Sequence, residues 1–160
     1  MSSLRPGRDV FDDSHLATWL SQDQCTAFSE LPRHDRNHLY RVGQIMIHQA
    51  PDNRDLIVAA FLHDLGKAYQ GLHVRVIDRV AKVLLQVISP RMLQSLATPP
   101  PTRLRGGLVL AVHHPEIGAQ RAKDLGCSDR TCWLIAHHEA PRAFNDPDLD
   151  LLATIDGATP

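Results

Sequence analysis

The sequence predicts an all-α protein, a helical bundle of about six to eight helices. Apolar residues recur at helical spacing in most segments, and the alternation that marks strands is almost absent. The 160 residues are the size of one domain, and a hydrophobic content of 43% is enough for a real core. We therefore expect residues 1–160 to form a single domain, with an N-terminal helical extension over 1–31 and a core over about 32–159.

Capping residues and prolines set the start of most predicted helices. Serine or aspartate precedes several apolar runs, where its side chain can accept a hydrogen bond from the first free N–H groups. Proline begins other helices because its fixed φ suits the first turn. Helices are predicted at 13–20 and 23–31 in the N-terminal extension, and at 32–49, 55–66, 74–87, 90–96, 115–125, 128–139 and 148–155 in the core.

The segments between these helices are short, with one exception. The stretch Thr98–Gly107 is rich in proline and glycine, and we expect a loop or lid near the functional site. The stretch Leu108–Val112 that follows is a short apolar run, which is either strand-like or the first turn of a helix. Residues 68–72 form a break with Gly71 at its centre, and 141–147 form a polar turn.

The charge and the cysteine content exclude several classes of protein. The net charge is −1 and the pI about 6.8, so no basic surface for nucleic acid or an anionic membrane is expected. Three cysteines without metal-type spacing suit a reducing compartment. No apolar run is long enough to span a bilayer, and the first residues lack the apolar core of a signal peptide. We expect a cytoplasmic protein.

The apolar run Leu56–Leu62 is followed at once by His63 and Asp64, and then by Gly66 and Lys67. A run this apolar predicts a buried helix, which carries an imidazole and a carboxylate into the interior. An unpaired charge there costs several kcal/mol, and a divalent cation is the simplest compensation. A helix end with a salt-bridged aspartate is the alternative. Lys67 lies on the same face, where it can receive an anion.

The chain contains ten histidines, roughly three times the number that average usage predicts. Several of them, and one aspartate, join apolar helical faces: His38, His113, His114, His137, His138 and Asp156. One buried histidine usually hydrogen-bonds a carbonyl group and nothing more. Several helices that each bring a histidine or an aspartate to an apolar face are better explained by one polynuclear metal centre.

The order His38, His63-Asp64 and Asp156 resembles the H…HD…D signature of the HD superfamily of metal-dependent phosphohydrolases. The motif HDLGK at 63–67 is close to a form that is common in that superfamily. Three further motifs resemble the second half of two-metal members, including the HD-GYP phosphodiesterases: HPEIGA at 114–119, AHHE at 136–139 and TIDGAT at 154–159. The resemblance covers roughly 32–159 and implies an all-α HD-domain bundle.

The resemblance also implies a set of ligands for two divalent transition metals, such as Fe, Mn, Ni, Co or Zn. One ion would be held by His38, His63, Asp64 and Asp156, and a second by Asp64, His114 and one or both of His137 and His138. His113 stays an alternative to His114 as the ligand. Lys67 would contact the phosphate or the leaving group of the substrate.

The activity implied by the resemblance is hydrolysis of a phosphate mono- or diester, with a small nucleotide-like compound as the expected substrate. Two cations about 3.5–4 Å apart can bridge a hydroxide and clamp a phosphate oxygen. The hydroxide would attack phosphorus in line, with Asp64 and Lys67 as the catalytic residues. No Gly-Tyr-Pro turn follows Glu139, so we do not expect cleavage of cyclic dinucleotides.

Two other functions fit the same side chains. The ligand set also resembles that of the mixed-valent di-iron oxygenases of this superfamily, such as inositol oxygenase. An HD module can also bind a nucleotide and signal to a partner without catalysis. Hydrolases and oxygenases of the superfamily share this ligand set, so the sequence hardly separates the two activities. Because the whole set of ligands is present, we favour an enzyme over a non-catalytic module, with hydrolysis as the expected activity.

Overall fold

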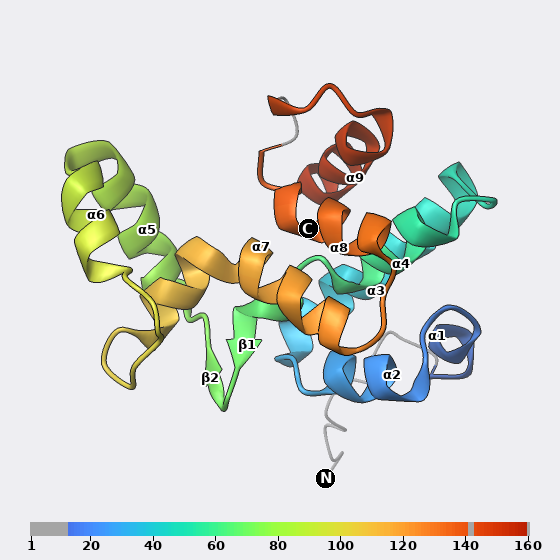
Figure 1. Ribbon diagram of the computed structural model, residues 1–160, viewed down its shortest axis with the longest axis horizontal. Coiled ribbons are helices and arrows are strands. Elements are labelled where there is room, and N and C mark those ends of the chain that lie inside the picture. Colours follow the sequence, from blue (N-terminus) through green and yellow to red (C-terminus); the bar gives the residue numbers. More distant parts are fainter. Residues whose placement is uncertain (1–12, 141–142, 160) are drawn as a thin grey trace, which may run out of the picture.

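The computed structural model describes residues 13–140 and 143–159, and its architecture is all-α, as predicted (Figure 1). This part of the chain has nine α-helices, a 3₁₀ helix and one two-stranded hairpin. None of the described helices combines the length and the apolar character that crossing a bilayer requires. Residues 1–12, the first part of the predicted N-terminal extension, lie outside the described residues.

The elements follow one another along the chain with short connections. They are α1 (Asp13–Trp19), α2 (Gln22–Ser29), α3 (Arg33–Gln49), α4 (Arg54–Leu62), η1 (Leu65–Lys67), β1 (Ala68–Tyr69), β2 (Leu72–His73), α5 (Val76–Ile88), α6 (Pro90–Leu96), α7 (Gly106–Asp124), α8 (Asp129–His137) and α9 (Pro147–Ala158). The serine before α8 caps that helix, because the Ser128 hydroxyl accepts from the Thr131 N–H at 3.0 Å. Helix α2 begins before Asp23, because Ser21 forms a capping box with Gln24.

Helix α4 lies at the centre of the largest hydrophobic cluster, which explains why it is apolar all round. Every residue from Leu56 to Leu62 is buried, and the same cluster contains core residues of α1, α2, α3, α8 and α9. A Cβ atom added at Gly43 of α3 would lie 2.3 Å from Cε1 of Phe61. The glycine therefore allows α3 and α4 to pack closely, which brings His38 and His63 together.

The chain leaves α4 earlier than predicted. The α-helix ends at Leu62 rather than Gly66, since Asp64 (φ −95°, ψ 10°) departs from helical geometry. The next three residues form η1, in which side chains three apart are eclipsed, so that Lys67 lies over Asp64. The predicted break at 68–72 is a tight hairpin whose two central residues, Gln70 and Gly71, both have positive φ.

Helix α7 is longer than predicted and passes through Pro115 without interruption. Residues 108–112 are thus the first turns of the same helix and not a strand. The helix lies against η1, where Gly66 and Gly118 let the two backbones approach: a Cβ atom at Gly66 would lie 2.1 Å from the carbonyl oxygen of His114. This contact sets the distance between the His63-Asp64 pair and the histidine of α7.

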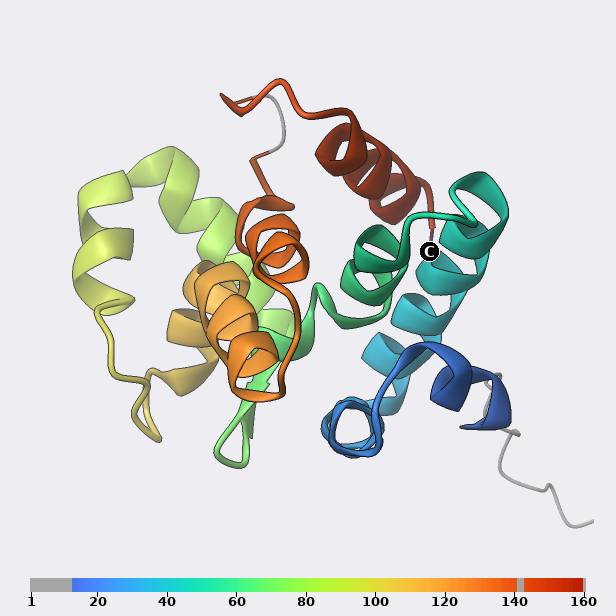
Figure 2. The same ribbon diagram turned by 45° about the vertical axis from the view of Figure 1, so that its right-hand side comes forward.

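Helices α5 and α6 extend to one side of the molecule, beyond α7 and away from α1 and α2, in both views (Figures 1 and 2). The helix predicted over 74–87 is present as α5 and is amphipathic, but its apolar side faces solvent. Asp78, on the polar side, is buried against the start of α7, where a Cβ atom at Gly107 would lie 2.1 Å from its Oδ2.

The close approach of η1 and α7 leads to a prediction about stability. We expect Gly66→Ala to lower the free energy of unfolding by about 1–3 kcal/mol, because backbone atoms of α7 occupy the space of the new methyl group. Gly157→Ala is the control: no atom lies within 4 Å of the added Cβ, and alanine favours a helix. Urea denaturation of both variants measures the difference. Equal stability of the two variants would contradict the packing described here.

Candidate metal centre

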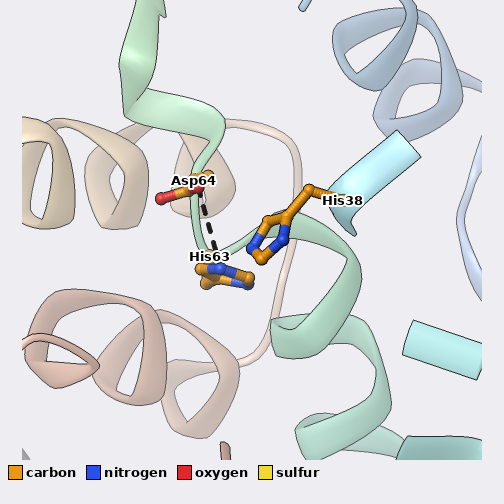
Figure 3. A group of neighbouring side chains, drawn as sticks. All are labelled: His38, His63 and Asp64. Atoms are coloured by element: carbon orange, nitrogen blue, oxygen red, sulfur yellow. Dashed lines mark ion pairs between the residues drawn. The ribbon is translucent and has the colours of Figure 1, made fainter. Parts of the chain in front are cut away.

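Six of the predicted site residues converge at one place in the bundle. They come from α3 (His38), the end of α4 (His63 and Asp64), α7 (His114), the end of α8 (His138) and α9 (Asp156). Figure 3 shows the first part of this cluster, in which His38 reaches from α3 towards His63 and Asp64. The five elements are far apart in the sequence, so the cluster exists only in the folded chain.

Asp64 is the residue that joins the two halves of the cluster. It is buried, and its Oδ2 lies 3.8 Å from Nε2 of His63. Its Oδ1 lies 3.4 Å from Nε2 of His114 and 3.8 Å from Nε2 of His138. The two carboxylate oxygens thus face two different groups of histidines, each with the geometry of a possible metal site: His38, His63 and Asp64, and Asp64, His114 and His138.

Asp156, on α9, lies beside the first group, which is His38, His63 and Asp64. Its Oδ1 lies 2.7 Å from Nε2 of His38 and 3.1 Å from Nε2 of His63. The short distances explain the low pKa of this carboxyl group: burial alone would raise the pKa, but the hydrogen bonds to His38 and His63 lower it well below its usual range. Asp156 is therefore ionised at neutral pH.

Three of the histidines have the same orientation. The Nδ1 atoms of His63, His114 and His138 lie 3.1, 3.3 and 2.8 Å from the carbonyl oxygens three residues earlier in the chain. A carbonyl oxygen can only accept, so each Nδ1 carries the hydrogen and donates it. In the neutral ring Nε2 then bears a lone pair, and in all three residues that atom faces the carboxylates. This is the orientation that metal-binding histidines adopt.

Burial and nearby charges shift the pKa values of these three histidines in different directions. Burial lowers the pKa of His114 to about 4, against the opposing effect of Asp64 and Glu139, and burial also lowers the pKa of His138. Burial alone would lower the pKa of His63 as well, but the charges of Asp64 and Asp156 outweigh it and raise the pKa. The rings of His114 and His138 are therefore neutral at pH 7, with lone pairs that face an anion.

This arrangement fits a divalent cation. The neutral Nε2 atoms of His114 and His138 repel the Asp64 carboxylate unless a positive charge lies between them. Burial raises the pKa of Asp64, but the charges of His63 and Lys67 lower it below its usual range, so the carboxylate is not neutralised by a proton. Imidazole nitrogens and carboxylate oxygens are the ligands that Zn, Mn, Fe and similar ions take in proteins.

Charged side chains surround the cluster. Lys67 forms an ion pair with Oδ2 of Asp64. Glu139 was not predicted as a site residue: its Oε1 lies 3.6 Å from Nε2 of His114, and Lys82 of α5 donates to its two oxygens at 3.0 and 2.9 Å. The available signal was its position directly after His138, as the acidic residue of the AHHE motif.

Two histidines that were alternative candidates for metal ligands, His137 and His113, lie apart from the cluster. Nδ1 of His137 lies 2.7 Å from the carbonyl oxygen of Trp133, and its ring packs against Trp133 and Phe144, with centroids 4.7 and 4.3 Å away. These contacts hold the His137 ring at Trp133 and Phe144, while Nε2 of His138 lies 3.8 Å from Asp64. Of the two histidines that the resemblance left open, the structure brings His138 to the cluster and places His137 apart from it. His113 lines a separate cavity between α5, α6 and α7.

The comparison with protein families agrees with this geometry. The family model described as HD domain matches residues 36–155, which is most of the chain. The match includes five of the six residues of the cluster and ends directly before the sixth, Asp156. No curated protein and no solved structure matches the chain. The residues that resembled the HD signature are those that converge around Asp64. The chain belongs to the HD domain family.

Proposed function

We propose that this protein is a metal-dependent phosphohydrolase with two divalent cations at the cluster around Asp64. The observation that carries the proposal is the position of Asp64, whose two oxygens face two separate groups of histidines. A carboxylate in this position can bridge two ions, and a pair of ions is a common device for cleaving phosphate esters. The HD domain family consists mostly of metal-dependent hydrolases, which supports the same assignment.

We assign the ligands to two ions as the resemblance implied, with His138 as the histidine from the end of α8. His38, His63, Asp64 and Asp156 would hold one ion, and Asp64, His114 and His138 the other. The carbonyl bonds at Nδ1 of His63, His114 and His138 keep Nε2 free for the ions. Bound cations would supply an activated water and neutralise charge on the phosphate.

Lys67 is the residue of the chain that we assign to the substrate. Its ammonium group pairs with Oδ2 of Asp64 and is partly exposed, so it lies between the cluster and solvent. Ions bound at Asp64 would weaken this pair, and the ammonium group could then contact a phosphate oxygen. Asp156 and Glu139 are also partly exposed, which marks the open side of the site. We propose that a small phosphorylated compound, of nucleotide type, enters from this side.

The test is elemental analysis of protein purified without chelator, followed by assays on phosphate mono- and diesters with each metal. We expect two equivalents of transition metal and hydrolysis of at least one ester. Protein that holds iron, shows a mixed-valent electron paramagnetic resonance signal and consumes dioxygen without hydrolysing any ester would instead be an oxygenase. Protein that binds a nucleotide tightly and turns over nothing would be a signalling module.

Removal of the bridging carboxylate should abolish both metal binding and activity. We expect Asp64→Ala to lose both ions and all hydrolysis, because both groups of ligands share this residue. Asp52→Ala, at an exposed position in the turn before α4, is the control and should keep both. Metal content and initial rates are measured on the same preparations. An Asp64→Ala protein that keeps its metal and its activity would place the site elsewhere.

The two neighbouring histidines of α8 allow a matched comparison. His138→Ala should lose metal from the second group, because Nε2 of this residue faces Asp64. His137→Ala should keep the metal content of the wild type, because its ring packs against Trp133 and Phe144. Elemental analysis decides between them. If the loss of metal followed His137→Ala instead, the assignment of the two residues would be reversed.

Replacement of the lysine should separate metal binding from catalysis. We expect Lys67→Ala to keep both ions but to lower kcat by about 100- to 1,000-fold, as removal of one stabilising donor does in other enzymes. Lys123→Ala, on an exposed turn of α7, is the control. Steady-state kinetics at constant metal occupancy measures the effect. Unchanged kcat in the Lys67→Ala protein would exclude this role for the ammonium group.

A further inference from the structure

Helix α5 is amphipathic, but its apolar side chains face solvent and not the core of the bundle. Two apolar side chains of α6 are also exposed. These residues, which we call the α5–α6 apolar face, are Val76, Ile77, Val80, Val83, Leu84, Val87, Ile88, Met92 and Leu96. Val87, for example, is 81% exposed. Large aliphatic side chains in such a group indicate a surface that is covered in the working protein.

The polar side of α5 is held against the body of the protein, so this orientation is set by specific contacts. Arg79 donates to Oδ1 of Asp35 on α3 at 2.9 Å, and Lys82 donates to Glu139 at the end of α8. Asp78 is buried at the start of α7. Rotating α5 to bury its apolar side would break both ion pairs and leave the buried Asp35 without its cation, so the helix keeps its apolar side towards solvent.

The size of the face matches what a stable interface needs. The exposed fractions of the nine side chains correspond to several hundred Å² of apolar surface. A monomer rarely exposes an apolar patch of more than a few hundred Å², and each subunit of a stable complex contributes roughly 800 Å². The face is therefore of the same order of size as one side of a protein–protein interface.

The spacing of the apolar residues indicates that the partner surface is another helix. Ile77, Val80, Leu84 and Val87 are separated by three, four and three positions, which is the spacing of a helix–helix seam. The seam is rich in β-branched residues and has no aromatic side chain of the kind that anchors helices at a membrane surface. Arg79 and Lys82, the cations of the polar side of α5, are paired with carboxylates of the same chain. Lipid is thus a poor match for this surface.

We propose that the α5–α6 apolar face binds the same face of a second copy of this chain, which forms a two-fold dimer. A two-fold interface joins one patch to itself, so a single self-complementary seam is sufficient. The α5–α6 pairs of the two copies would then pack as four helices around a shared apolar core. The proposal does not depend on the catalytic activity of the protein.

The test is sedimentation velocity of the full chain over a micromolar concentration series, alone and as two variants. We expect the wild type to reach twice its chain mass of 17.8 kDa. Val87→Glu should shift the protein to the monomer, because it places a carboxylate of each copy in the seam. Leu104→Glu is the matched control: Leu104 is 94% exposed but lies in the loop before α7, outside the face, and its variant should stay dimeric.

Several results would overturn the dimer. A wild type that stays at 17.8 kDa at every concentration is one, and equal dissociation of both variants is another. An assembly that persists in Val87→Glu would place the interface elsewhere. Monomeric wild type that floats with vesicles of anionic phospholipid would assign the face to a membrane. If Val87→Glu lowers the melting temperature, Val83→Lys takes its place, because that position is also exposed on the seam side of α5.

Discussion

The buried carboxylate of Asp64 is the constraint on which the rest of the structure depends. Removing an anion from water costs several kcal/mol unless opposite charges and hydrogen bonds surround it. His63 and Lys67 supply positive charge to this carboxylate. His114 and His138 present Nε2 to it, and a cation bound between them would complete the compensation. A bundle of helices that must each bring one ring to the same point has little freedom in how it packs.

Small residues at the helix contacts make this convergence possible. Gly43 lets the ring of Phe61 lie against α3, and Gly66 lets η1 touch the backbone of α7 near His114. Larger side chains at either position would move the ligands apart by the width of a methyl group or more. The segment 63–67 therefore combines two candidate ligands, His63 and Asp64, with Gly66, which sets their distance from α7.

The sequence was sufficient to predict the helical class and most of the cluster, because an apolar run that carries His63 and Asp64 inward requires a compensating charge at its end. It could not separate His137 from His138, since both end the same helix and only the packing of Leu134 and Ile135 decides which one points inward. It also could not predict the orientation of α5. An amphipathic stripe normally faces the core, and here the partners that reverse it are distant in sequence.

Two ion pairs join the polar side of helix α5 to segments that carry residues of the cluster. The carboxylate that holds Arg79 belongs to Asp35, one helical turn before His38, and the one that holds Lys82 belongs to Glu139, directly after His138. Both ion pairs therefore end beside a residue of the cluster, one in each of its two groups. In a dimer of the proposed kind, the second copy would press on the apolar side of α5 while its polar side stays bound to α3 and α8. The proposed dimer is thus compatible with both ion pairs, because it uses the side of α5 that faces away from His38 and His138.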